Sequence, residues 1–156
     1  MTAEVSLRAV RDGDVAVFFD QDSDPAARLM AAFSAAKSPA EFAAHWARIR
    51  SDATVILRTV VSGETILGYV GSFFRGSERE VCYWLGREHW GRGVASEALR
   101  LFLLELRERP LHARVACDNA GSLRVLERRG FKRTGQVRSF ADARGREIDE
   151  VLLVLL

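Results

Sequence analysis

A glycine-rich turn between an apolar strand and an amphipathic helix constrains this chain more than any other segment. Residues 83–95 read Tyr-Trp-Leu-Gly-Arg-Glu-His-Trp-Gly-Arg-Gly-Val-Ala. Gly91 and Gly93, one residue apart, let the backbone approach a ligand without a Cβ in the way. The helix that follows directs its free N–H groups and its positive dipole end at the same point. The sequence therefore predicts a site for a pyrophosphate, and so for a nucleotide-bearing cofactor.

Two familiar phosphate-binding loops do not describe this turn. The P-loop requires Lys and then Ser or Thr after its last glycine, whereas Val94 and Ala95 follow Gly93. The dinucleotide fingerprint requires a third Gly or Ala, where this chain has Ser96. That fingerprint also lies near the start of a βαβ unit, while this loop lies past the middle of the chain.

A third pattern fits better, and it occurs together with a second block. Trp90-Gly91-Arg92-Gly93-Val94-Ala95 resembles the acetyl-CoA loop of the GNAT superfamily of N-acetyltransferases, Arg/Gln-x-x-Gly-x-Gly/Ala, with Trp at the first position. Asp118-Asn119-Ala120-Gly121-Ser122, followed by Gly130-Phe131, looks like the superfamily's Asn-x-x-Ser…Gly-Phe segment. The resemblance covers residues 3–155. The Tyr-Trp-apolar run before the glycines is similar to the branch that acetylates the N-termini of ribosomal proteins.

The resemblance implies acetyl-CoA as the cofactor and assigns residues to it. The backbone of Trp84, Leu85 and Gly86 would pair with the pantetheine arm. The pyrophosphate would lie on the loop formed by Trp90, Gly91, Arg92, Gly93, Val94, Ala95 and Ser96. Asn119 would hydrogen-bond the pantetheine amides, and the same residue type is a favoured helix N-cap, so the two roles are compatible. Ser122 would protonate the leaving thiolate, although an exposed serine on a helix needs no such role.

The acceptor side is less determined by the sequence. Glu80, on the strand that leads to the glycines, is the candidate base, because a carboxylate buried beside an apolar strand has a raised pKa. The alternative for Glu80 is an ion pair with a neighbouring arginine. Tyr83 and Trp84 point to opposite faces of that strand, where each would line the acceptor pocket or pack in the core.

The acceptor implied by the resemblance is a primary amine, either a peptide N-terminus or a small molecule. Asp20, Asp22 and Asp24 precede a helix and would attract a cationic amine, or serve only as loop acids and a helix cap.

Composition excludes several classes of protein. The chain has 156 residues with a net charge of +2, and its 23 basic residues are spread along it, so we expect one domain over 1–156 and no nucleic-acid partner. The basic run at 124–133 would be a solvated helix end or would attract cofactor phosphates. Two cysteines and no metal-ligand spacing of the histidines predict neither a disulfide framework nor a metal site. The absence of a signal pattern and of a long apolar stretch predicts a cytoplasmic protein without a membrane span. A homodimer is left open.

Periodicity predicts an α/β (α+β) fold with a mixed, mostly antiparallel sheet of six to seven strands and four to five flanking helices. Alternation or β-branched content indicates strands near residue 7 and over 54–61, 65–74, 79–85, 111–116, 134–140 and 147–155. Cap signals open helices at Asp12–Asp14, Asp24-Pro25, Ser38-Pro39 and Asn119, and a helix follows the glycines until Pro110 stops it. This order of elements is also that of the GNAT superfamily.

Three functions remain open on these grounds. The first is an acetyl-CoA-dependent N-acetyltransferase that transfers the acetyl group directly. The second is a catalytically silent acyl-CoA-binding sensor or partner module on the same fold, since backbone alone can bind the cofactor. The third is a nucleotide-binding regulator, for which the Asn119 block would be a coincidence.

Overall fold

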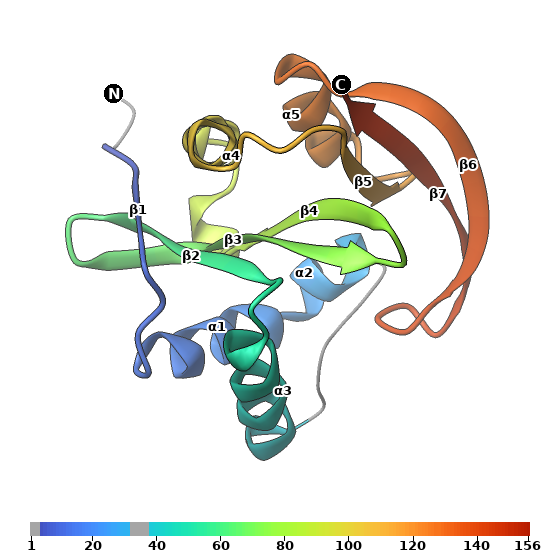
Figure 1. The fold of residues 1–156 in the computed structure, drawn as a ribbon. Coiled ribbons are helices and arrows are strands. Elements are labelled where there is room, and N and C mark those ends of the chain that lie inside the picture. Colours follow the sequence, from blue (N-terminus) through green and yellow to red (C-terminus); the bar gives the residue numbers. More distant parts are fainter. Residues whose placement is uncertain (1–3, 32–37) are drawn as a thin grey trace.

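Within residues 4–31 and 38–156, which the computed structural model describes, seven strands form one twisted sheet (Figure 1). The strands follow the order β1-β2-β3-β4-β5-β7-β6, and every neighbouring pair is antiparallel except β4 and β5. Their bounds are β1 Ser6–Arg8, β2 Ile56–Ser62, β3 Thr65–Arg75, β4 Glu78–Leu85, β5 Leu111–Ala116, β6 Lys132–Ala141 and β7 Arg146–Leu155. The predicted mixed, mostly antiparallel sheet is thus confirmed.

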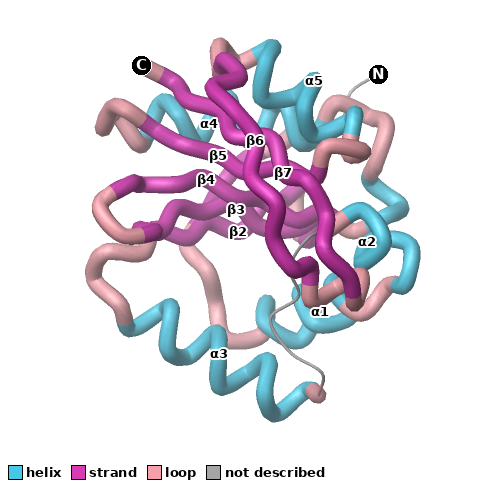
Figure 2. The backbone as a smooth tube through the Cα atoms, turned by 90° about the vertical axis from the view of Figure 1, so that its right-hand side faces the viewer, coloured by secondary structure: helices cyan, strands magenta, loops and turns pink. Residues whose placement is uncertain are grey.

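The helices of the described chain cover both faces of the sheet (Figure 1). On one face lie α4 (Val94–Glu105) and α5 (Ala120–Arg128), and on the other lie α1 (Asp14–Asp22), α2 (Pro25–Met30) and α3 (Pro39–Ser51). A single 3₁₀ turn, η1 (Arg87–His89), joins β4 to the glycines. Figure 2 shows the β6–β7 hairpin curving across the side of the molecule, and its turn lies near the end of α2.

Two helices begin at the caps that the sequence predicts. The side chain of Asp24 accepts a hydrogen bond from the backbone N–H of Ala26 at 2.9 Å, and Ser38 accepts one from Glu41 at 3.1 Å. A proline occupies the first turn of each helix, where its missing N–H would have had no partner. These local signals therefore set where α2 and α3 start.

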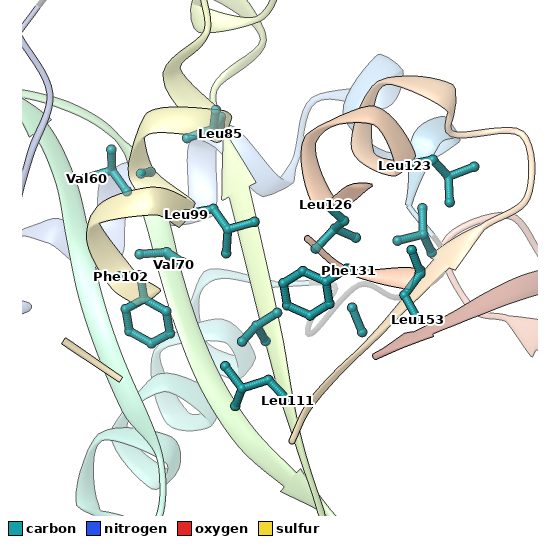
Figure 3. Packing of buried hydrophobic residues seen from close by; sticks show 14 of the residues in the cluster. Val60, Val70, Leu85, Leu99, Phe102, Leu111, Leu123, Leu126, Phe131 and Leu153 are labelled. Carbon is teal, nitrogen blue, oxygen red and sulfur yellow. The ribbon is translucent and has the colours of Figure 1, made fainter. Parts of the chain in front are cut away.

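The main core lies between the sheet and the α4–α5 layer (Figure 3). Leu99 and Phe102 of α4 are fully buried, as the helical spacing predicts, and pack with apolar side chains of β2, β3 and β5. Truncating a buried Phe or Leu to Ala typically costs about 3–5 kcal/mol. This packing fixes the start of α4, and with it the glycines, against the sheet.

A second cluster packs on the opposite face. Phe18 of α1 and Trp46 of α3 have ring centroids 4.8 Å apart, and Tyr69 of β3 packs edge-on against both. Phe42 completes the buried cluster. These aromatic contacts hold α1 and α3 on the sheet, and α1 in turn fixes the position of the short α2 that follows it.

Several predicted boundaries differ from the structure. Strand β2 begins at Ile56 rather than Thr54, because Asp52 accepts hydrogen bonds from the backbone N–H and the hydroxyl of Thr54 and holds a turn there. Helix α1, expected to open at Asp12–Asp14, begins at Asp14 and ends at Asp22. Helix α4 ends at Glu105, well before Pro110, because the chain becomes extended at the next residue.

The contact between β4 and β5 positions the site. Strand β4 pairs with β3 along its whole length, whereas its parallel register with β5 is the single pair Glu80 and His112 among the described residues. Strand β5 pairs with β7 from one end to the other. The sheet is therefore continuous on both sides of the β4–β5 junction, and the two strands part beyond Glu80.

Candidate functional site

A cavity of about 630 Å³ lies where β4 and β5 part. The start of α4, helix α5 and the end of α2 complete its wall. Residues of both faces of β4 reach it: Tyr83 from the face that packs with α4 and α5, and Cys82 and Trp84 from the opposite face. The cavity therefore connects the two layers of helices through the opening in the sheet.

The edge of β4 along this opening carries backbone groups that the ladder with β3 does not use. The N–H of Gly86 donates to the carbonyl of Leu67 at 3.0 Å, and hydrogen-bonded pairs in an antiparallel ladder alternate every second residue. By that alternation, the backbone N–H and C=O groups of Tyr83 and Leu85 point away from β3, toward the cavity, where the Leu85 carbonyl accepts from the indole of Trp90. An extended ligand with amide groups can pair with such an edge.

The two glycines adopt the conformation that their predicted role requires. Gly91 has φ +73° and Gly93 has φ +76°, the left-handed region that glycine adopts without strain. Gly93 is the N-cap of α4 and caps it without a side chain, so the first N–H groups of the helix are left for a ligand. Both glycines line the cavity, together with Val94, Ala95 and Ser96.

Most of the site residues predicted from the sequence line this one cavity. They are Tyr83, Trp84, Leu85, Trp90, Gly91, Gly93, Val94, Ala95, Ser96, Asn119 and Ser122. Three do not line it. The N–H of Gly86 is used in the ladder with β3, Arg92 lines a neighbouring cavity of about 490 Å³ beside α4, and Glu80 lies elsewhere on β4.

The two tryptophans fix the ends of the β4 segment. The indole N–H of Trp90 donates to the carbonyl of Leu85 at 3.2 Å, while 40% of Trp90 stays exposed. The indole N–H of Trp84 donates to the carbonyl of Gln21 at the end of α1, at 3.2 Å. Trp90 thus occupies one of the carbonyls expected to face the pantetheine arm, and its partly exposed ring lies at the edge of the cavity.

Asn119 is the N-cap of α5, as the sequence predicts. Its side-chain oxygen accepts from the N–H of Ser122 at 3.2 Å. Its side-chain N–H₂ group donates to the carbonyl of Met30 at the end of α2, also at 3.2 Å. The structural role of Asn119 is therefore established, and its role toward a cofactor stays a prediction.

Two hydroxyl groups meet in the cavity. The phenol of Tyr83 lies 2.6 Å from the hydroxyl of Ser122, so strand β4 and helix α5 are joined by a hydrogen bond across the opening. Burial raises the pKa of Tyr83 to about 12, against a smaller lowering by the hydrogen bond to Ser122. Both groups are therefore neutral at physiological pH and both carry a proton that can be donated.

Cys82, next to Tyr83, also lines the cavity. Burial raises the pKa of its thiol to about 12, and the nearby charge of Glu80 acts in the same direction.

Glu80 lies on the face of β4 away from α4 and α5 and is only 3% exposed. Its carboxylate forms an ion pair with Arg75, and Arg114 of β5 lies 3.8 Å away. Arg75 and Glu80 are thus the arginine–carboxylate pair that the sequence left as the alternative. The role of Glu80 as a base stays a prediction, and these contacts favour a structural role.

The end of α2 is held over the cavity by an arginine that no sequence pattern indicated. Arg144, in the β6–β7 turn, forms two hydrogen bonds to Asp118 at 2.7 and 2.8 Å. It also donates to the carbonyls of Ala31 at 3.1 Å and Met30 at 3.2 Å. Its side chain is 5% exposed. The turn sequence around Arg144 carries no signal for this role, because its partners are distant in the chain.

The charged runs noted in the sequence separate in space. Arg124 and Arg128, one turn apart on α5, line the cavity, whereas Arg133 pairs with Glu127 at 3.0 Å. The acidic run before α2 also has partners.

Within that run, Asp22 lies 3.6 Å from Arg28, and Asp24 forms an ion pair with Arg87 at 3.0 Å as well as capping α2. Asp24 is thus the predicted helix cap, whereas Asp22 is not a loop acid, because it is the buried last residue of α1.

Two further features are absent from the part of the chain that the structure describes. In residues 4–31 and 38–156, no three His, Cys, Asp or Glu side chains are grouped so that they could hold a metal ion. No helix in those residues is both long enough and apolar enough to span a bilayer.

Comparison with known proteins agrees with this geometry. Residues 4–132 match the family model of the acetyltransferase (GNAT) domain. An uncharacterized N-acetyltransferase p20 of Bacillus licheniformis is 36% identical over 81 residues, which are 49% of this chain and 46% of that protein. The chain spans about half the length of the curated relatives it matches.

Two solved structures share the fold at low sequence identity. A spermidine N-acetyltransferase from Vibrio cholerae, in complex with CoA and spermine, superposes with a TM-score of 0.82 at 19% identity, over 97% of this chain and 95% of that one. A ribosomal-protein-alanine N-acetyltransferase from Brucella melitensis gives 0.83 at 19% identity, over 97% and 99%. Because the family model matches most of the chain, the protein belongs to the acetyltransferase family defined by the GNAT domain.

Proposed function

We propose that this protein is an acetyl-CoA-dependent N-acetyltransferase that moves the acetyl group directly to a primary amine. The observation that carries the proposal is the cavity that passes through the sheet between β4 and β5. It joins the glycine turn at the start of α4 to the Tyr83–Ser122 hydroxyl pair. A cofactor arm and an acceptor can therefore meet from opposite faces of the sheet.

The residues of the chain fit the cofactor in three ways. The start of α4 offers free N–H groups and a positive dipole end to a pyrophosphate. Arg124 and Arg128 add positive charge to the same wall. The open edge of β4 supplies backbone partners for the amides of a pantetheine arm. When bound, acetyl-CoA supplies the acetyl group as a thioester.

For acetyl transfer, the protein has to position the amine and the thioester and to supply one proton to the leaving sulfur. The amine nitrogen forms a bond to the carbonyl carbon, the carbon–sulfur bond breaks, and the electron pair leaves on sulfur. Ser122 would donate its hydroxyl proton to that sulfur, and the amine would lose its proton to water or to the predicted base Glu80. Holding the two reactants in line can supply much of the rate enhancement.

Two classes of primary amine are candidates for the acceptor. The fold neighbours include one protein named for spermidine and one for ribosomal-protein alanine, so both polyamines and peptide N-termini are candidates. The branch that acetylates ribosomal-protein N-termini is the one that the Tyr83-Trp84 run resembles.

A panel of amines tests the proposal. We expect acetyl-CoA-dependent release of free thiol with at least one class among polyamines, peptides with a free N-terminus and small amines. The matched control omits the amine. Tight CoA binding without turnover on any amine would instead favour the silent acyl-CoA-binding module, and no CoA binding would contradict both.

The glycine turn gives a sharper binding test. Gly93→Val should weaken CoA binding by more than tenfold, equivalent to about 1.4 kcal/mol, because the new side chain lies where the phosphates are expected. Gly63→Val is the matched control, since Gly63 has φ +59° in the β2–β3 turn and would carry similar backbone strain far from the cavity. Isothermal calorimetry measures both. Equal CoA affinity in the two variants would contradict the assignment of the pyrophosphate to the glycine turn.

A further inference from the structure

The hydrogen bond between Tyr83 and Ser122 connects two elements that share no sequence motif. Tyr83 belongs to β4 and Ser122 to the first turn of α5, 39 residues later. The short distance of 2.6 Å and the burial of the tyrosine ring give this contact a defined geometry. Both residues line the cavity.

The serine is held in place by its own backbone. The N–H of Ser122 donates to the cap residue Asn119, so its main chain is fixed at the start of α5. Its hydroxyl has one proton and can donate one hydrogen bond while accepting others. If Ser122 donates toward a ligand in the cavity, then Tyr83 must be the donor in the hydrogen bond between the two hydroxyls.

We infer, on the basis of the acetyl transfer proposed above, that Tyr83 acts through Ser122 as a positioning residue and proton source. Ser122 passes its proton to the leaving sulfur as the carbon–sulfur bond breaks. Tyr83 passes its phenolic proton to the oxygen of Ser122 in the same step. A proton from water then restores the phenol, and it balances the proton that the amine nitrogen releases.

The surroundings of Tyr83 suit this role. Because burial raises its pKa, its phenol stays protonated at neutral pH and can donate the hydrogen bond to Ser122. The carboxylate of Glu80 lies on the opposite face of β4 and is engaged by arginines. The phenol of Tyr83 therefore pairs with the hydroxyl of Ser122 and not with this carboxylate.

The chain offers a matched pair of variants. It contains two tyrosines, Tyr83 and Tyr69, and Tyr69 packs in the aromatic cluster of α1 and α3, outside the cavity. Tyr83→Phe and Tyr69→Phe each remove one hydroxyl and keep the ring. With an amine that the wild type acetylates, we expect Tyr83→Phe to lower kcat about tenfold with an unchanged KM for acetyl-CoA, and Tyr69→Phe to leave kcat unchanged.

A double mutant separates a relay from a packing effect. Ser122→Ala should lower kcat about 100-fold, and adding Tyr83→Phe should lower it no further, because Tyr83 acts only through Ser122. Additive losses would overturn the inference, and so would a Tyr83→Phe enzyme with full kcat. A wild type that acetylates no amine would instead contradict the proposed function itself.

A titration supplies a readout that needs no turnover. In Tyr69→Phe, Tyr83 is the remaining tyrosine, so its ionisation can be followed by ultraviolet absorbance. We expect the pKa of Tyr83 to lie well above the ordinary value of about 10, and to rise further when Ser122→Ala is added, because the serine hydrogen bond lowers it. An unchanged pKa after loss of the serine hydroxyl would overturn the hydrogen bond on which the inference depends.

Discussion

The two faces of β4 bury polar side chains in opposite ways. On one face, Tyr83 meets Ser122 in the cavity, and both groups are neutral hydroxyls. On the other face, three residues earlier, Glu80 is enclosed by Arg75 and Arg114 in a charged cluster. The first pair can pass a proton toward a negatively charged leaving group, whereas the second keeps its charge fixed by strong partners.

In the proposed acetyl transfer, the two faces of β4 serve different roles, one structural and one catalytic. A buried charge must keep its partners, because removing one partner leaves the other uncompensated. Such a cluster joins β3, β4 and β5 at the point where the sheet begins to part. The hydroxyl pair lies beyond that point, where the strand edge is open. We therefore expect substitutions on the face of Glu80 to lower the stability of the protein, and substitutions on the face of Tyr83 to lower the rate of acetyl transfer.

The largest expected effect concerns Glu80. Glu80→Gln should lower the free energy of unfolding by about 2 kcal/mol, because the buried side chain loses its charge-assisted contacts to Arg75 and Arg114, while water can still solvate the half-exposed Arg75. Urea unfolding measures this. The matched control is Glu78→Gln on the same strand, where the carboxylate is 56% exposed, and its effect should be small.

The rate of the same variant tests the comparison directly. If Glu80 only joins the strands, the turnover number of Glu80→Gln should stay within about tenfold of the wild type, with the same dependence on pH. A turnover number about 100-fold lower, with a flattened limb in the pH–rate profile, would identify Glu80 as the base. The two faces of β4 would then both take part in catalysis.

The next effect concerns the end of α2, which closes the cavity on the face of Glu80. Arg144→Ala should raise the KM for the amine about tenfold while changing the KM for acetyl-CoA little, because the carbonyls of Met30 and Ala31 lose their anchor. Arg144→Lys should restore only part, since lysine cannot form the two-pronged contact with Asp118.

Arg138→Ala is the control for that variant. It lies in the same hairpin and pairs with exposed carboxylates, outside the cavity. Steady-state kinetics with both substrates varied would show a change in the amine KM for Arg144→Ala alone. Equal effects of the two variants would mean that the hairpin as a whole, and not the anchor, determines acceptor binding.

The smallest effect appears only in acid. Burial alone would raise the pKa of Asp14, but hydrogen bonds from Arg8, the N–H of Arg11 and Thr59 outweigh it and lower the pKa from 3.8 to about 2. Since this pKa is lower in the folded protein, the stabilisation is present above pH 3.8 and is lost as the pH falls toward 2. Asp14 anchors α1, so acid should loosen the α1–α3 face first.

Asp14→Asn tests that expectation. Tryptophan fluorescence during acid unfolding should show a weaker dependence on pH for the variant than for the wild type. An identical acid transition would mean that Asp14 does not control the acid stability of this face.

Local signals predicted most of the fold, because their physics is local. Caps at Asp24, Ser38 and Asn119 start their helices as expected, and the spacing of Leu99 and Phe102 marks the buried face of α4. The conformation of the glycine turn was predictable for the same reason, since glycine adopts the left-handed backbone of this turn without strain.

Contacts between distant segments could not be predicted in this way. Alternation placed Tyr83 on one face of β4, but only the packing of α5 brings Ser122 to it. The parting of β4 and β5 depends on how β5 pairs with β7, which no single strand encodes. Arg144 joins the β6–β7 turn to Asp118 and to the end of α2, and none of these three segments carries a sequence pattern that predicts the contact.

The protonated thiol of Cys82 bears on whether the acetyl group passes directly from cofactor to amine or first to the protein. Burial raises the pKa of the thiol to about 12 and keeps it protonated at neutral pH, so Cys82 is a poor acyl carrier despite its position in the wall. Transfer without a carrier requires donor and acceptor in one ternary complex. Double-reciprocal plots should then intersect, in contrast to the parallel lines of a ping-pong enzyme, and alkylating reagents should spare the cavity.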